Sequence, residues 1–341
     1  MKTSKPSRAL SAAAALLTLT LLASGCAAAD DSAGDSAGST DVAAGGKEFG
    51  TADEKTAALG SDAAPGEFPR TVDHALGTTE IEKRPERVVV LDTGELDDVL
   101  ALGITPVGMV TTEGAQPVPS YLAEETQGVE TVGTISELDL EKIASLEPDL
   151  ILGSQLRAEK LYDELEAIAP TVFSIRPGFP WKENFLLVGD ALGLEEEATA
   201  ELNEYGREVK ALGDSVTGDP TISLVRFMPG KLRLYGNASL IGVILADAGL
   251  ARPETQNVDD LAVEISPEKL DEADGDVIFY SSYGEPGATG ETEALQTSQW
   301  TNLPAVRDGR AYRVDDDVWF LGLGPIGAKQ VVEDLDRYLA Q

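Results

Sequence analysis

The chain has 341 residues, of which 42% are hydrophobic, so it can bury the cores of two domains of ordinary size. Its 60 acidic residues outnumber 26 basic ones, and the net charge of -34 argues against nucleic acid or an anionic membrane surface as a direct partner. With a single histidine, His74, and a single cysteine, Cys26, the chain offers no internal disulfide, Cys/His zinc site or spread Ser-His-Asp chemistry.

The first 25 residues have the composition of a secretory signal peptide. Lys2, Lys5 and Arg8 precede an uncharged stretch, residues 9–25, which is too short and alanine-rich to be a convincing membrane-spanning helix. The stretch leads into Leu-Ala-Ser-Gly-Cys26, which resembles the bacterial lipobox, where the cysteine thiol receives a diacylglyceryl group. We therefore expect a signal peptide over 1–25 and lipidation of Cys26; the alternative is an incidental cysteine behind an ordinary signal.

Residues 26–66 consist mostly of Ala, Gly, Ser, Thr and Asp. Such a segment cannot bury enough apolar surface to offset the entropy lost on ordering, so we expect a flexible, lipidated tether. His74 follows shortly after it and is assigned to the surface or to an edge strand.

Apolar runs and helical patterns alternate from residue 67 to residue 180, which predicts a parallel sheet covered by helices. The expected strands are 88–91, 106–110, 149–152 and 171–174, and the expected helices are 96–102, 140–146 and 158–168.

Residues 181–213 have a helix-forming composition, interrupted mildly by three glycines, and predict one long helix or a kinked pair. The alternation then resumes over 214–341, so we expect a second α/β lobe beyond this helix. Its expected strands are 221–227, 232–235, 277–281 and 311–314, and its expected helices are 240–248, 267–272 and 327–339.

An internal repeat supports the division into two lobes. Residues 139–154 align without a gap to residues 266–281, and the matches include Glu141 with Glu268. In each copy a capping residue precedes a helix with glutamate in its first turn, and a strand follows. Two lobes presenting equivalent glutamates are expected; a chance match of generic helix and strand segments is the alternative.

The sequence resembles the substrate-binding lipoproteins of iron-siderophore ABC importers over the whole chain beyond the tether. The segments that carry this resemblance are Arg87–Asp92 with Leu102–Gly108, Val132–Gly133 with Leu140–Ile143 and Glu147–Ile151, the long helix with Leu192–Gly193, and Trp300 with Leu303–Arg310.

The resemblance implies an α/β fold with two Rossmann-like lobes, mainly parallel sheets, a long rigid connecting helix and a ligand cleft between the lobes. It implies an exported, monomeric protein, anchored to the outer face of the membrane only through Cys26, that captures a ferric siderophore and delivers it to permease subunits. The ligand brings its own iron and iron-binding oxygens, so no cofactor and no metal-binding side chains are expected. In this family the two docking positions hold a glutamate, here Glu141 and Glu268.

Ligands of open α/β sheets bind at the carboxyl ends of the strands. Aromatic rings offer wide contact there, and guanidinium groups can donate to the oxygens around iron. Phe227 and Tyr280 are assigned to the core, and both roles stay open for Arg233 and Tyr235. The expected ligand contacts are Thr93, Tyr121, Arg176, Trp181, Arg226, Tyr235, Tyr283 and Trp319.

Arg226 is the best candidate for a cation in the cleft, and the chain is strongly acidic, so a neutral or cationic hydroxamate complex is favoured over a catecholate. A protein of the same fold for cobalamin or haem is an alternative; haem would need Tyr121, Tyr235, Tyr280 or Tyr283 as its axial ligand. An exported hydrolase with paired carboxylates is a further alternative, although the Gly-x-Ser-x-Gly stretch of the sequence, residues 34–38, lies in the expected tether and not between a strand and a helix, as a nucleophile elbow requires.

Overall fold

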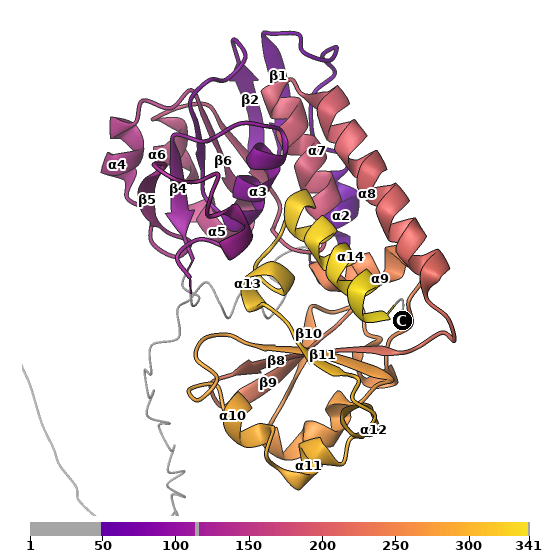
Figure 1. Cartoon of the computed structure of the whole chain (residues 1–341). Helices are drawn as coiled ribbons and strands as arrows, with labels where there is room; N and C mark the ends of the chain where they lie inside the picture. The colour runs from indigo at the N-terminus through magenta and orange to yellow at the C-terminus, as the bar shows by residue number, and fades with distance from the viewer. Residues whose placement is uncertain (1–48, 113–115, 340–341) are drawn as a thin grey trace, which may run out of the picture. The chain divides into compact units, whose positions relative to one another are not determined.

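The computed structural model describes residues 49–112 and 116–339 (Figure 1). The predictions for the signal peptide, for Cys26 and for the tether up to residue 48 lie outside these residues. Within them, no helix is long and apolar enough to cross a membrane, and no three His, Cys, Asp or Glu side chains are grouped so that they could hold a metal ion.

The expected tether is corrected between residues 49 and 66, because this segment packs against the folded body. A short 3-10 helix, η1 (Phe49–Thr51), leads into α2 (Ala52–Thr56), which packs against α7 (Trp181–Leu192) and buries Ala52 and Thr56. Only a few residues of the segment make these contacts, so its average composition is still that of a flexible linker.

A β-hairpin that the sequence analysis missed precedes the first sheet. Strands β1 (Arg70–His74) and β2 (Gly77–Ile81) pair antiparallel. His74 lies in this hairpin as expected for an edge strand, but its ring is buried between the hydroxyl groups of Thr79 and Tyr162, and burial lowers its pKa to about 4.

The first lobe contains a parallel sheet of five strands in the order β5-β4-β3-β6-β7. Chain order reverses between β3 and β6, so the carboxyl ends of these two strands form the switch point at which such sheets bind ligands. The elements of this lobe are β3 (Val88–Val90), α3 (Thr93–Ala101), β4 (Gly108–Thr111), η2 (Ser120–Leu122), β5 (Glu130–Thr134), α4 (Leu140–Ser145), β6 (Leu150–Ser154), α5 (Gln155–Ala158), η3 (Glu159–Leu161), α6 (Tyr162–Glu166) and β7 (Thr171–Ser174).

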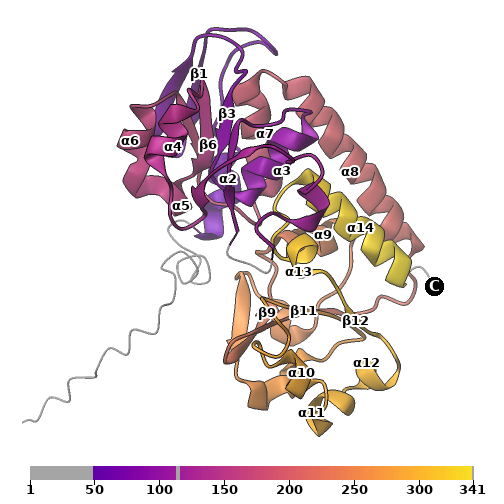
Figure 2. The same cartoon turned by 60° about the vertical axis from the view of Figure 1, so that its left-hand side comes forward.

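The connecting segment is a kinked pair of helices, α7 and α8 (Glu195–Ser215). Gly193 ends α7 in the left-handed conformation, with φ of 64°, which a residue with a side chain adopts at a cost. Figures 1 and 2 show α8 running from α7 toward α9 (Leu240–Asp247) and α14 (Pro325–Leu339), and it packs against all three. The connection is therefore helical.

The second lobe contains a mixed sheet of five strands in the order β10-β9-β8-β11-β12. Strands β8, β11 and β12 are parallel, whereas β9 and β10 are antiparallel additions at one side. Its remaining elements are β8 (Ile222–Met228), β9 (Lys231–Tyr235), η4 (Glu254–Gln256), β10 (Ala262–Ile265), η5 (Pro267–Ala273), β11 (Val277–Ser282), α10 (Glu291–Ala294), α11 (Ser298–Thr301), α12 (Pro304–Arg307), β12 (Ala311–Arg313) and α13 (Asp316–Trp319).

Helix α3 of the first lobe caps helix α14 of the second. The carboxylate of Asp97 accepts hydrogen bonds from the backbone N–H groups of Ile326 (2.8 Å) and Gly327 (2.9 Å), and from the hydroxyl of Tyr121 (2.7 Å). A carboxylate at a helix N-terminus satisfies otherwise unpaired donors. This cap and the helical connection both restrict rotation of one lobe against the other.

Three buried carboxyl groups of α3 make the stability of the protein depend on pH. Burial and the nearby charge of Asp92 raise the pKa of Glu95 to about 8, burial raises that of Asp97 to about 6, and burial raises that of Asp98. The folded state therefore binds these protons more tightly than the unfolded state does. Stability decreases as the pH rises through these folded pKa values, by about 1.4 kcal/mol per group and pH unit.

We expect the melting temperature to rise when the pH is lowered from about 8 to about 5. His74, whose pKa is lowered from 6.5 to about 4, opposes this trend below pH 6.5, and carboxylates whose pKa is lowered in the folded state, such as Asp276, oppose it only at more acidic pH. Glu95→Gln, which cannot ionise, should flatten the dependence near neutral pH. A melting temperature that falls on acidification from pH 8 to pH 6 would contradict this assignment.

Candidate functional site

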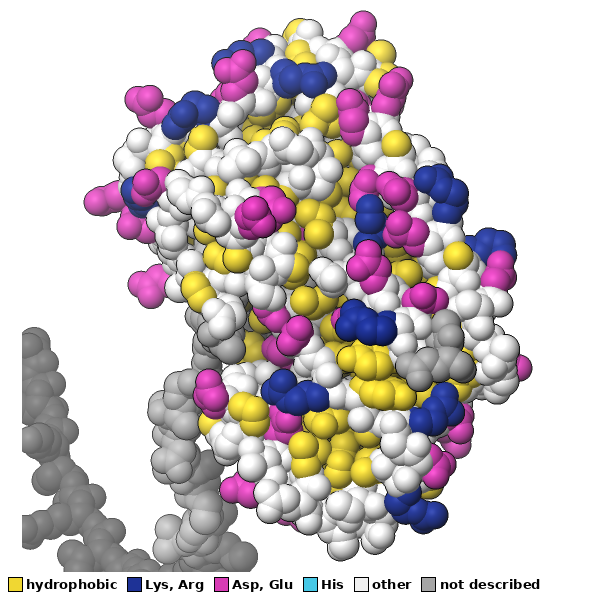
Figure 3. All heavy atoms as spheres, viewed as in Figure 1, with side chains coloured by type: hydrophobic (Ala, Val, Ile, Leu, Met, Phe, Trp, Pro, Cys, Tyr) yellow, Lys and Arg dark blue, Asp and Glu magenta, His cyan; other side chains and the backbone are white. Residues whose placement is uncertain are grey.

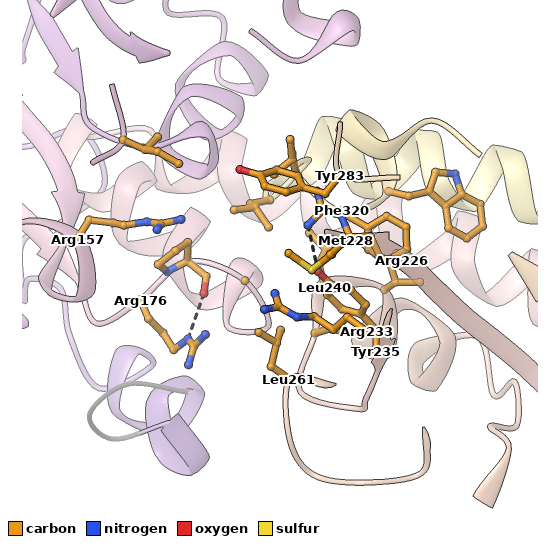
Figure 4. A pocket seen from close by; sticks show the side chains of 18 of the residues that line it. Arg157, Arg176, Arg226, Met228, Arg233, Tyr235, Leu240, Leu261, Tyr283 and Phe320 are labelled. Atoms are coloured by element: carbon orange, nitrogen blue, oxygen red, sulfur yellow. Dashed lines mark hydrogen bonds between the residues drawn. The ribbon is translucent and has the colours of Figure 1, made fainter. Parts of the chain in front are cut away.

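A cavity lies between the two lobes, at the carboxyl ends of the strands of the first sheet and beside β8 and β9 of the second (Figure 4). Water molecules can be centred in about 110 Å³ of it, and the space between its walls, open solvent included, is about 910 Å³. Its lining consists of Ile135, Ser136, Arg157, Arg176, Pro177, Gly178, Arg226, Met228, Arg233, Tyr235, Ser239, Leu240, Ile241, Leu261, Tyr283, Trp319, Phe320, Leu321 and Leu323.

The first lobe supplies two arginines. Arg157 follows β6, and its Nε donates to Asp92, which follows β3, over 2.8 Å, so this ion pair spans the switch point of the sheet. Arg176 follows β7, and its Nε donates to the backbone oxygen of Pro177. The positions of both follow from the topology, because parallel strands end at the same edge.

Arg226 enters from β8 of the second lobe and is held on several sides. Its guanidinium donates two hydrogen bonds to Asp316 of α13 and one of 3.1 Å to the hydroxyl of Tyr235. The rings of Tyr283 and Phe320 lie 4.5 Å and 5.3 Å from its central carbon. A guanidinium fixed in this way needs little further ordering when it binds an anion.

Arg233, on β9, is the fourth arginine of the cavity and is paired with Glu264 of β10 at 2.8 Å. Figure 4 shows Arg157 and Arg176 on one side of the cavity and Arg226 and Arg233 on the other. The lining residues named above include no Asp or Glu, because the paired carboxylates lie behind the guanidinium groups.

Burial and the nearby charge of Arg157 lower the pKa of Arg176 to about 10, so Arg176 is protonated at neutral pH. Repulsion between the two guanidinium groups is relieved when an anion binds between them. Arg176 therefore contributes a positive charge to the wall of the cavity.

Five of the predicted ligand contacts meet in this cavity: Arg176, Arg226, Tyr235, Tyr283 and Trp319. Trp319 is held rigidly, because its indole N–H donates to Asp334 over 2.9 Å and its ring packs on Phe279. Arg233, for which both roles were open, also lines the cavity. Phe227 is buried in the core and Tyr280 packs against it, as expected.

Three predicted contacts are corrected, because the structure places them outside the cavity lining. Trp181 is fully buried and packs edge-on against Tyr205 of α8, in the core beneath the lobe connection. The hydroxyl of Thr93 donates to the backbone oxygen of Leu321, and Tyr121 donates to Asp97, so both join the lobes. The position of a residue near the end of a strand therefore does not by itself determine whether its side chain points into the cavity.

Arg157 lines the cavity but was not predicted from the sequence. The same rule that selected Arg176 would have selected it, since it lies three residues beyond the end of β6. No role was assigned to Arg157 from the sequence, and its charge was not counted in the cleft.

The two predicted docking glutamates are exposed, one on each lobe. Glu141 lies in the first turn of α4, which Asp139 caps by accepting from the backbone N–H of Lys142. Glu268 lies in η5, a 3-10 helix rather than the α-helix expected from the repeat. Acidic side chains are spread over the face shown in Figure 3, mainly on the first lobe.

Two α/β lobes joined by helix, with a charged cavity between them, define a solute-binding protein. The chain belongs to the periplasmic binding protein family, whose model matches residues 88–318. Members of this family bind solutes, so the chain is a binding protein rather than an enzyme.

Curated relatives and solved structures agree with this family. The chain is 38% identical to the probable siderophore-binding lipoprotein YfiY of Bacillus subtilis, over 79% of this chain and 87% of the relative. It is 31% identical to the Fe(3+)-citrate-binding protein YfmC of the same organism, over 76% and 82%. The crystal structure of Staphylococcus aureus SirA complexed with staphyloferrin B is similar with a TM-score of 0.71 and 32% identity, covering 79% of this chain and 98% of SirA.

Proposed function

We propose that this protein captures a ferric siderophore or related ferric chelate outside the cytoplasm and delivers it to an ABC importer. The observation that carries the proposal is the cavity with four arginines between the lobes. The names of the relatives support it, since YfiY is a probable siderophore-binding lipoprotein and YfmC a Fe(3+)-citrate-binding protein. The iron arrives already coordinated, and the protein recognises the outer surface of the complex.

We further propose that the ligand is an anionic ferric chelate of the carboxylate type. The hydroxamate preference depended on Arg226 as the main cation of the cleft, and that premise is replaced by four guanidinium groups on opposite walls. Guanidinium groups bind carboxylate oxygens through paired hydrogen bonds. SirA was crystallised with staphyloferrin B, whereas the relative FhuD, 29% identical, is named for iron(3+)-hydroxamate, so relatives differ in ligand.

The test is a titration of tryptophan fluorescence, for which Trp319, fully buried at the border of the cavity, provides a reporter. Ferric citrate and ferric staphyloferrin B should bind at least tenfold more tightly than ferrioxamine B, which is cationic, and the difference should decrease with added salt. Ferric enterobactin tests whether a catecholate anion also fits. Tightest binding of ferrioxamine B would restore the hydroxamate assignment, and binding of no ferric chelate would reject the proposed function.

The same titration distinguishes the alternatives within this fold. Haem would need a tyrosine ligand, and Tyr121 and Tyr280 are outside the cavity lining, while the hydroxyl of Tyr235 accepts a hydrogen bond from Arg226. Tyr283 is then the remaining candidate of the four. A Soret band with haemin, or quenching by cobalamin tighter than by any ferric chelate, would favour these ligands.

We propose that Cys26 anchors the monomeric protein to the outer face of the membrane and that Glu141 and Glu268 contact the permease. The lipobox at Cys26 supports anchoring, since two acyl chains hold a protein stably where one is marginal. Mass spectrometry of the membrane-extracted protein should find a diacylglyceryl group on an N-terminal Cys26. Detection of an unmodified cysteine there would contradict it.

A further inference from the structure

Phe49 is the first described residue of the expected tether, and it packs against residues of both lobes. Its ring packs edge-on against Phe179, with the centroids 5.3 Å apart, and it also packs against the buried apolar core of the second lobe. The following helix, α2, packs on α7 and buries Ala52. The segment is therefore part of the folded body, although its composition is that of a linker.

Phe49 also contacts Arg176, one of the residues that line the cavity. The central guanidinium carbon of Arg176 lies 4.3 Å from the centre of the Phe49 ring and 5.7 Å from that of Phe179. Arg176 is only 2% exposed, and its backbone oxygen accepts from the Asn184 side chain over 2.8 Å. Its main chain is thus held by α7, and the two rings border its charged end.

The packing of aromatic rings against Arg176 offsets two energetic costs of burying this side chain. Burial and Arg157 both disfavour the charge of Arg176, and an arginine side chain has several rotatable bonds whose ordering costs entropy. The negative face of an aromatic ring stabilises a buried guanidinium and limits its rotamers. Arg226 has a comparable pair of rings in Tyr283 and Phe320, so both walls hold an arginine against aromatic side chains.

We propose that Phe49 is a positioning residue for Arg176, and hence that the segment joining the tether to the lobes tunes the affinity for the anionic ligand. The identity of the ligand in this proposal rests on the proposed function. The contact between Phe49 and Arg176 does not depend on it. It assigns a binding role to a segment that precedes both lobes in sequence.

The experiment compares Phe49→Leu, which keeps an apolar side chain but removes the ring, with Phe49→Tyr, which keeps the ring. Phe68→Leu is the matched control, because Phe68 lies 4.5 Å from the guanidinium of Arg70, which is outside the cavity lining. We expect Phe49→Leu to weaken binding of ferric citrate about fivefold, and Phe49→Tyr and Phe68→Leu to bind as the unchanged protein does. In an Arg176→Gln background, Phe49→Leu should have no further effect on affinity.

A second measurement does not depend on the ligand. In the unliganded protein, the NMR order parameter of the Arg176 Nε–H bond should fall in Phe49→Leu and stay unchanged in Phe68→Leu. An unchanged order parameter, or equal losses of affinity with and without Arg176, would overturn the positioning role. If the unchanged protein binds no ferric chelate, the proposed function fails, while the order parameter still decides whether Phe49 holds Arg176.

Discussion

Replacement of both Glu141 and Glu268 by alanine is expected to abolish iron uptake by cells while leaving the affinity for the ferric chelate unchanged. Both side chains are exposed and neither lines the cavity, so their removal affects neither the core nor the binding site. Charges at the rim of an interface mainly set the orientation and rate of association. A permease with two similar subunits would require one such charge on each lobe.

An acidic residue in a first turn also stabilises its own helix by about 0.3–1 kcal/mol without any partner. The control therefore removes two other exposed helical glutamates, one per lobe: Glu164 of α6 and Glu293 of α10. This Glu164→Ala, Glu293→Ala variant changes the net charge equally and should support normal uptake. Uptake of labelled ferric chelate at matched expression is the measurement; normal uptake by the Glu141 and Glu268 variant would exclude docking as their role.

Arg226→Ala is expected to weaken ligand binding by about a hundredfold or more. The substitution removes a buried charge-assisted donor, and such losses cost about 2–5 kcal/mol. It also leaves Asp316, bonded to Arg226 and Ser281, without its cation behind an anionic ligand. Both effects act in the same direction.

Asp316→Asn in the Arg226→Ala background should recover part of the affinity, because it removes the unpaired carboxylate. Arg313→Ala is the control, since Arg313 is also paired with a carboxylate of the second lobe, Glu291, but lies outside the cavity lining. Fluorescence titration with ferric citrate and ferric staphyloferrin B measures all four proteins. Equal affinity of Arg226→Ala and the unchanged protein would show that the ligand binds elsewhere.

The sequence alone determined the two α/β lobes, the helical connection and the strands that end at the cavity. Apolar strand runs such as Val88–Leu91 and helical periodicity are local patterns of the sequence. Strands that alternate with helices form parallel sheets, for which only a few topologies are possible. The same rule about strand ends selected Arg176 and Arg226, and it applied equally to Arg157, which was overlooked. The hairpin at 70–81 was missed because its polar outer face weakens the strand signal.

Only the tertiary structure decided the direction of each side chain and the charge of the site. Trp181 and Arg176 lie close together in sequence near the same strand end, yet packing of α7 on α8 turns Trp181 into the core while Arg176 lines the cavity. Net charge over the whole chain suggested a neutral or cationic ligand, whereas the fold gathers four arginines at one cavity, and the carboxylates that pair with three of them are not part of its lining. The local charge of a site depends on which segments, distant in sequence, meet in the fold. The packing of Phe49 depends on the fold in the same way, because its contact with Arg176 joins residues far apart in the chain.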